Sequence, residues 1–274
     1  MPVLITGAHR WLARRLALRL IGEGGEVRAY SDGDTSVLRA AGVMVASGTP
    51  DDEGRLDAAL TDVHTLIHVG PGLLAHDPAD IELEATVAAR AAASAGVRRV
   101  ITLSVPGAAL DADDPVRRAK AVEESVIAAV PAPSVVVRSS LVDTAATRDA
   151  LATARLVGVG TTVDDVEVAP VRPQDLVELL VAFDRARSRA REGHLLVAAD
   201  GPVRTSVGHY LDPSPTGTTG RTSLVGRRLL DDARAERLHH VLRAGRWWTP
   251  PGDALDGWAF AEVVPEPPDS VLGP

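Results

Sequence analysis

Residues 3–13 read Val3-Leu4-Ile5-Thr6-Gly7-Ala8-His9-Arg10-Trp11-Leu12-Ala13, and the class of fold is first evident here. The first three of these residues are apolar and predict a short buried strand, which ends in a turn at Gly7. Leucines at four-residue spacing then predict a helix from Trp11 to Ile21. A strand that passes through a glycine turn into a helix is how a parallel α/β sheet begins.

The same alternation of apolar runs and helical patterns continues to about residue 145. It predicts an α/β fold, a Rossmann-type doubly wound parallel sheet with helices on both faces and a small C-terminal lobe. We divide the chain into a Rossmann-like domain at 1–200 and a C-terminal lobe at 201–274. After the first unit, strands are expected at 26–30, 43–46, 65–69, 100–103, 134–137 and 194–198, and helices at 36–41, 56–60, 81–95, from Pro115, at 175–186 and at 229–242. Residues 210–221 are expected to form a loop, and 249–274 a proline-rich acidic tail.

Composition excludes several classes of function. The formal net charge of -8 argues against a nucleic-acid-binding surface. The chain has no cysteine, its histidines lack the spacing of a zinc motif, and we expect no metal site. No apolar run reaches membrane-spanning length and the start does not resemble a signal peptide, so we expect a soluble cytoplasmic protein. A Gly-x-Ser-x-Gly elbow is absent, which leaves serine hydrolase chemistry without support.

Lys120 is the only lysine in a chain with Lys+Arg 29. Lysine is a compact point charge, whereas arginine is a planar fork. Lys120 therefore either marks a site that the fork would not fit or is one residue of a solvated helix face.

The chain contains, in order, Thr6-Gly7-Ala8, Gly96-Val97-Arg98-Arg99-Val100 and Lys120-Ala121-Val122-Glu123, with Gln174-Asp175-Leu176-Val177 as a further match. In this order the segments resemble the extended and atypical short-chain dehydrogenase/reductases, which include the NAD-dependent epimerase/dehydratases and the NmrA-like proteins. The resemblance covers roughly the first two thirds of the chain. It implies a Rossmann domain with a small substrate lobe, and hydride transfer with NAD(P) by a Ser/Thr, a Tyr and a Lys.

The phosphate loop departs from the family pattern Gly-x-x-Gly-x-x-Gly. Gly7 keeps the tight turn, and Ala13 is small enough for close helix–strand packing, but Arg10 replaces the middle glycine. Gly7, His9, Arg10 and Ala13 are candidate cofactor-binding residues. Arg10 either holds an anion through its guanidinium or fills the place of the diphosphate, and we favour obstruction.

Three further positions are cofactor candidates. Asp32 follows the second strand and is placed to bond a ribose hydroxyl, although Asp32-Gly33-Asp34 is also an ordinary turn. His68 and Gly70 end the fourth strand, where relatives line the cofactor. The alternative for His68, which we favour, is a histidine packed in the strand.

The catalytic pattern is incomplete. Relatives carry Tyr-x-x-x-Lys on the helix that holds Lys120, but the tyrosine position is Val116 here. Lys120 and Ser104 remain as candidate catalytic residues, and Lys120 is also a cofactor candidate. A tyrosine from elsewhere, Tyr210, could approach from the C-terminal lobe.

We therefore expect a non-redox binding or regulatory module that retains an NAD(P)-binding fold and takes a small-molecule ligand or a protein partner. The alternative is an atypical NAD(P)-dependent epimerase or reductase acting on a small molecule or nucleotide sugar. A cofactor-independent enzyme is a third hypothesis. NAD or NADP binding stays open, and a homodimer is conceivable. The tryptophan-rich segment around Trp247 and Trp248 is a candidate interface.

Overall fold

The structure is a computed structural model that describes residues 1–71, 77–157, 163–185, 194–201 and 203–212, together with 238 and 242. The expected tail at 249–274, the tryptophan pair and most of the expected helix at 229–242 lie outside the described residues. The domain boundary at residue 200 stays a prediction.

The expected doubly wound sheet is confirmed. Seven strands form one sheet in the order β3-β2-β1-β4-β5-β6-β8, and every neighbouring pair is parallel. The inner strands are buried along their length, which is why they appear in the sequence as continuous apolar runs. The strands are β1 (Val3–Thr6), β2 (Val27–Ser31), β3 (Met44–Ser47), β4 (Thr65–His68), β5 (Arg99–Ser104), β6 (Ser134–Ser139) and β8 (His194–Ala199).

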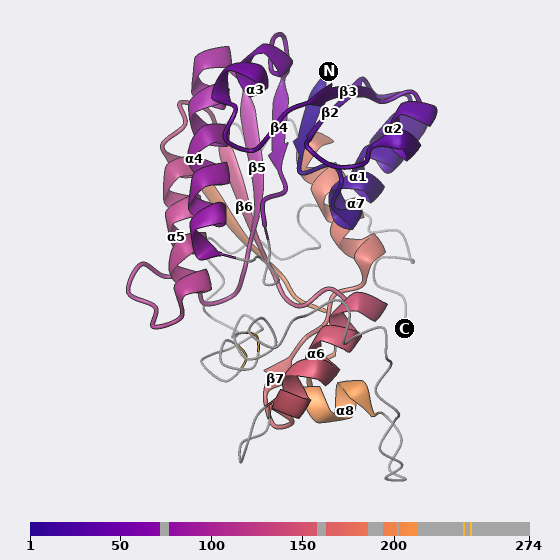
Figure 1. Ribbon diagram of the computed structural model, residues 1–274, viewed down its shortest axis with the longest axis vertical. Coiled ribbons are helices and arrows are strands. Elements are labelled where there is room, and N and C mark those ends of the chain that lie inside the picture. The colour runs from indigo at the N-terminus through magenta and orange to yellow at the C-terminus, as the bar shows by residue number, and fades with distance from the viewer. Residues whose placement is uncertain are drawn as a thin grey trace.

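Helices cover both faces of the sheet, as Figure 1 shows. One face carries α1 (Trp11–Gly22), α2 (Ser36–Ala40) and α7 (Pro173–Arg185), and the other carries α3 (Glu53–Ala59), α4 (Pro78–Ala95) and α5 (Pro115–Ala128). Each face has its own buried apolar cluster. Phe183 of α7 is among the largest fully buried side chains of the first cluster.

Local signals set the ends of the two long helices. Asp77 caps α4 by accepting a hydrogen bond from the backbone N–H of Ala79, and Pro78 follows as the first helical residue. Gly96 ends α4 with a left-handed φ of 65°. Asp114 caps α5 in the same way, through the N–H of Val116.

A small lobe lies beyond the carboxyl ends of the strands (Figure 1). It contains α6 (Ala145–Val157), α8 (Val207–Leu211) and a short antiparallel pair of β7 (Glu167–Val168) and β9 (Thr205–Ser206). The sequence pattern missed α6, and it wrongly placed Tyr210 in a loop, because Tyr210 is buried in α8. A third apolar cluster joins α5, α6 and α8, and includes Leu238 and Leu242.

The strand order reverses between β1 and β4, which is where ligands bind in doubly wound sheets. The turn after β1 and the residues after β4 therefore face each other across this switch point. They hold the candidate residues of the phosphate loop on one side and His68 and Gly70 on the other.

Truncation of Phe183 tests whether α7 belongs to the main core. We expect Phe183→Ala to lower the free energy of unfolding by about 3–5 kcal/mol, because a large side chain leaves a cavity between α7 and the sheet. Leu156→Ala, at a position that is 56% exposed, is the control and should change it by less than about 0.5 kcal/mol. Urea denaturation measures both, and equal effects would contradict the packing described for α7.

Candidate functional site

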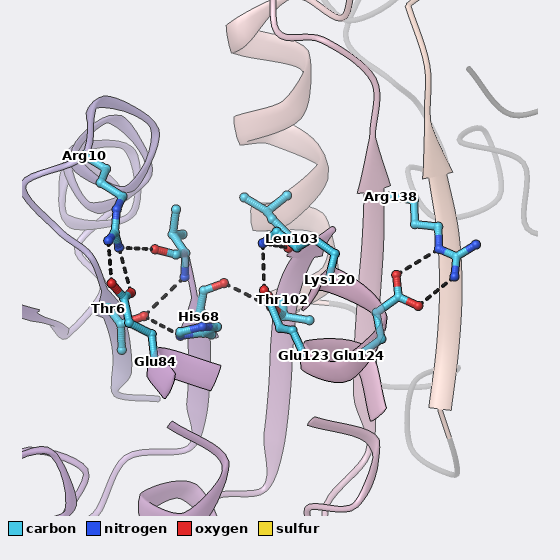
Figure 2. Close-up of polar contacts among 11 residues, drawn as sticks. Thr6, Arg10, His68, Glu84, Thr102, Leu103, Lys120, Glu123, Glu124 and Arg138 are labelled. Carbon is cyan, nitrogen blue, oxygen red and sulfur yellow. Dashed lines mark hydrogen bonds and ion pairs between the residues drawn. The ribbon is translucent and has the colours of Figure 1, made fainter. Parts of the chain in front are cut away.

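Arg10 lies across the switch point. Its guanidinium donates from Nη1 to the backbone carbonyl of Val69 at 2.8 Å, and from Nη1 and Nη2 to the two carboxylate oxygens of Glu84 at 3.2 and 2.8 Å. Figure 2 shows the side chain of Arg10 pointing to Glu84. One arginine therefore links the turn after β1, the end of β4 and helix α4.

The guanidinium rests directly on the glycine turn. Gly7 has a φ of 62°, a left-handed conformation that favours glycine. A Cβ on Gly7 would clash with Nη1 of Arg10 and with the carbonyl oxygen of Val69. Arg10 replaces the middle glycine of the loop. Its side chain therefore fills the space that a glycine would leave open.

The partner of Arg10 is an anion supplied by the chain itself. The side chains of Arg10 and Glu84 are 25% and 11% exposed. Burial raises the pKa of Glu84, and the hydrogen bonds and charge of Arg10 oppose that shift. The bidentate geometry is the strong form of an arginine–carboxylate pair. The positive charge of the loop is therefore already neutralised.

His9 fills the space beside the glycine turn. His9 Nδ1 lies 2.9 Å from the hydroxyl of Ser31 and 3.3 Å from a carboxylate oxygen of Asp32. The His9 ring also lies against Gly33, where an added Cβ would meet it. Burial and the charge of Arg10 lower the pKa of His9, against the opposing effect of Asp32.

Tyr30 fills the space beside the third strand. Its hydroxyl is within hydrogen-bond distance of the backbone carbonyls of Thr49 and Asp52, at 3.0 and 3.2 Å, and its ring end lies against Gly48. Burial, with the carboxylate of Asp52, raises the pKa of Tyr30 to about 12. The cavity left among these groups has a volume of about 20 Å³, room for about one water. It is lined by His9, Arg10, Tyr30, Asp32, His68 and Glu84, among others.

Lys120 is buried in an ion pair. Its Nζ donates to Glu123 Oε2 at 2.7 Å and to the backbone carbonyl of Leu103 at 3.0 Å (Figure 2). The two side chains are 3% and 0% exposed. The other carboxylate oxygen of Glu123 accepts from the hydroxyl of Thr102 at 2.6 Å. The single lysine is therefore a structural partner of Glu123 and is not part of a solvated helix face.

His68 lies on β4 between the two ion pairs (Figure 2). Its Nδ1 is 2.9 Å from the hydroxyl of Thr6, which also accepts from the backbone N–H of Val69. Among the described residues its Nε2 has no hydrogen-bond partner. Burial first, then the charges of Lys120 and Arg10, lower the pKa of His68 to about 3. The ring is therefore neutral at physiological pH and packed in the strand.

A cleft of about 670 Å³ lies at the carboxyl ends of β4, β5 and β6, beneath α6. Gly70, Ser104 and Lys120 all line it, so the tertiary structure brings these three candidates together. Ser104 is 3% exposed, and its hydroxyl has no partner among the described residues. Most of the other lining side chains are apolar, namely Trp11, Leu12, Leu103, Val105, Leu141, Val142, Ala150, Leu151, Leu176 and Leu238.

No phenol takes the place of the missing tyrosine within the described residues. Val116 is fully buried in the cluster shared by α5, α6 and α8. Tyr210 joins the same cluster, but its hydroxyl donates to Asp143 at 2.6 Å and the guanidinium of Arg148 lies 4.1 Å from its ring centre. Burial and the Asp143 carboxylate raise the pKa of Tyr210. Tyr210 thus fastens α8 to the lobe and does not line the cleft.

The remaining candidates fall into two groups. Gly7, His9, Arg10 and Asp32 gather at the turn after β1, where His9 and Arg10 also line the large cleft, while Ala13 is buried on the core face of α1. Two partners were not among the residues predicted from the sequence. Glu123 had a signal, because it lies three residues after Lys120 on the same helix. Glu84 had none, since it is 74 residues from Arg10.

The described residues offer neither a metal site nor a membrane span. They hold no group of three or more His, Cys, Asp or Glu side chains placed to share a metal ion. No helix among them has the length and apolar character to cross a bilayer.

Comparison with solved structures bears out the fold. The Citrobacter sp. triphenylmethane reductase complexed with NADP(H) is similar over 97% of this chain and 96% of its own, with a TM-score of 0.72 and 15% identity. The UDP-glucose 4-epimerase from Bifidobacterium longum, in complex with NAD+ and UDP, covers 76% of this chain and 80% of its own, with a TM-score of 0.60 and 16% identity.

A short-chain dehydrogenase/reductase superfamily protein from Agrobacterium tumefaciens with bound NAD covers 77% and 81%, with a TM-score of 0.59 and 14% identity. No family model matches the sequence, and no curated protein matches it. The chain therefore has the Rossmann-type fold of these structures, as expected.

A double-mutant cycle tests the structural role of Lys120. Lys120→Met or Glu123→Gln alone should each lower the free energy of unfolding by about 3–5 kcal/mol, because each leaves the charge of the other residue buried without its counter-ion. The double variant removes the pair and should cost clearly less than the sum of the two. Denaturant unfolding measures all three, and additive losses would show that the two side chains do not interact.

The buried His68 predicts a pH dependence of stability. Its pKa is lowered from 6.5 to about 3, so the unfolded chain takes up the proton first as the pH falls. The neutral His68 ring makes its full contribution to the free energy of unfolding above pH 6.5. Below pH 6.5 this contribution falls by about 1.4 kcal/mol per pH unit. We expect His68→Gln to flatten the curve of unfolding free energy against pH below 6.5. Parallel curves for the two proteins would contradict a buried neutral His68.

Proposed function

We propose that this protein is a non-redox binding module that retains the NAD(P)-binding fold of the short-chain dehydrogenases without holding a dinucleotide in the usual pose. The bridge from Arg10 to Val69 and Glu84 is the observation that carries the proposal. A dinucleotide in this fold lays its diphosphate over the glycine turn at the helix N-terminus.

The residues at the turn do not fit a diphosphate. The guanidinium of Arg10 lies where the phosphate oxygens would approach Gly7, and it already has a carboxylate partner. An entering diphosphate would have to displace Glu84, which would leave a mostly buried carboxylate without its cation. His9 Nδ1 also lies 3.3 Å from one carboxylate oxygen of Asp32, the residue expected to bond the ribose. Both contacts support obstruction over the anion clamp.

The groups expected for proton transfer also support a non-redox role. Val116 has no titratable group, and the hydroxyl of Tyr210 is engaged by Asp143. The charge of Lys120 is paired with Glu123, so it is not available to lower the pKa of a neighbouring acid.

The second candidate is an atypical NAD(P)-dependent epimerase or reductase. It is favoured by likeness over nearly the whole chain to a reductase complexed with NADP(H), and by the position of Lys120 and Ser104 in one cleft. A fold shared at 15% identity does not fix an activity. The two candidates differ in whether the unaltered protein binds a dinucleotide.

Thermal unfolding with NADH and NADPH separates them. A ligand at a hundredfold excess over its dissociation constant stabilises the folded state by about 2.7 kcal/mol. We expect no shift in Tm for the natural protein. The double variant Arg10→Gly/Glu84→Gln opens the turn without leaving a buried carboxylate, and we expect its Tm to rise by several degrees with one of the nucleotides.

Arg14→Ala is the matched control, because Arg14 is exposed on the same helix and should change nothing. The proposal fails if either nucleotide stabilises the natural protein. Loss of that stabilisation in the double variant would identify Arg10 as an anion clamp.

A further inference from the structure

The large cleft adjoins the closed turn, and His9, Arg10 and Glu84 line both. It has a volume of about 670 Å³, which lies within the range of small-molecule sites, and the cavity at the turn has about 20 Å³. The cleft thus has room for a ligand where the turn has none. The assignment of a ligand to this cleft rests on the proposed function, in which the nucleotide turn is closed.

The charges that line the cleft are balanced by neighbouring side chains. Arg10 is paired with Glu84, and Lys120 is paired with Glu123, in both cases within hydrogen-bond distance. Among the described lining residues, Asp80 alone is a charged group without an ion-pair partner, and it is exposed in the first turn of α4. A negative charge entering the cleft finds no free cation among these residues and meets this carboxylate at the rim. The cleft therefore selects against anions.

Ser104 lines the cleft and has a hydroxyl without a hydrogen-bond partner among the described residues. Ser139 donates to the backbone carbonyl of Ser140, and Thr147 pairs with Thr144, so these two lining hydroxyls are engaged. The Ser104 hydroxyl is buried and has no partner among the described residues. A buried polar group without a partner is unfavourable unless a ligand or water satisfies it.

We propose that the cleft is a binding site for an uncharged, largely apolar small molecule with one carbonyl or hydroxyl oxygen that accepts a hydrogen bond from Ser104. The apolar walls supply most of the binding free energy through burial of ligand surface. Ser104 fixes the orientation of the ligand. The paired charges exclude anionic metabolites, dinucleotides and sugar nucleotides among them.

The probe for this site is prodan, an uncharged naphthalene ketone whose fluorescence moves to the blue in apolar surroundings and responds to hydrogen bonds at its carbonyl. We expect saturable binding to the full chain with a dissociation constant on the order of 10 µM. An anilinonaphthalene sulfonate has a similar apolar body with a negative charge. It should bind at least about tenfold more weakly.

Three variants locate the probe. Ser104→Ala should weaken prodan binding by about two- to tenfold and move the bound emission further to the blue, because one neutral hydrogen bond is lost. Thr147→Trp projects an indole into the cleft from α6 and should abolish saturable binding. Ala146→Trp is its matched control, on the same helix at an exposed position that does not line the cleft, and it should bind prodan as the natural protein does.

Circular dichroism confirms that each variant is folded before titration. The inference is overturned if the folded natural protein does not bind prodan, if Thr147→Trp binds it as tightly as Ala146→Trp, or if the sulfonate binds as well as the ketone. Unchanged affinity and emission in Ser104→Ala would remove Ser104 from the site. None of these results depends on NADH or NADPH, so a failure of this inference can be distinguished from a failure of the proposed closure of the nucleotide turn.

Discussion

The half-buried guanidinium of Arg10 governs the arrangement of the switch point. Arg10 is placed at the start of α1 by the loop that follows β1, and its guanidinium needs an anion and acceptors close by. Glu84 and the carbonyl of Val69 supply them, which ties α4 and the end of β4 to the loop. A turn that usually attracts phosphate through the helix N-terminus is thereby satisfied from within the chain.

The same kind of compensation recurs along the carboxyl ends of the strands. Lys120 and Glu123 form a second pair, joined to β5 through Thr102 and Leu103. His68 lies between the two cations and stays neutral, because a third positive charge would be buried beside them. The cleft floor therefore carries little net charge, although it is lined by lysine, arginine and carboxylates. A cavity of this kind is suited to an uncharged ligand.

Most of the fold could be predicted from the sequence, since strands that are buried on both faces and helices with clear caps leave strong local patterns. Asp114-Pro115 and Gly96 mark helix ends that the structure has in the same places. The lobe was harder to predict. Helix α6 has a mixed composition with alanine, threonine and arginine, and α8 is only a short helix whose Tyr210 is held by Asp143 and Arg148 from distant positions. Contacts between residues far apart in the chain produce no periodic pattern in the sequence.

The sequence alone determined two departures from the family motifs, because each can be read directly at a motif position. The phosphate loop carries Arg10 in place of its middle glycine, and the helix of Lys120 carries Val116 in place of a tyrosine. What these residues do depends on contacts that only the folded chain makes. Arg10 and Glu84 are 74 positions apart, and Lys120 meets Leu103 across a helix–strand packing contact. Whether a cation is free for a ligand or already paired depends on which carboxylates the fold brings within about 3 Å of it, and no local pattern contains that information.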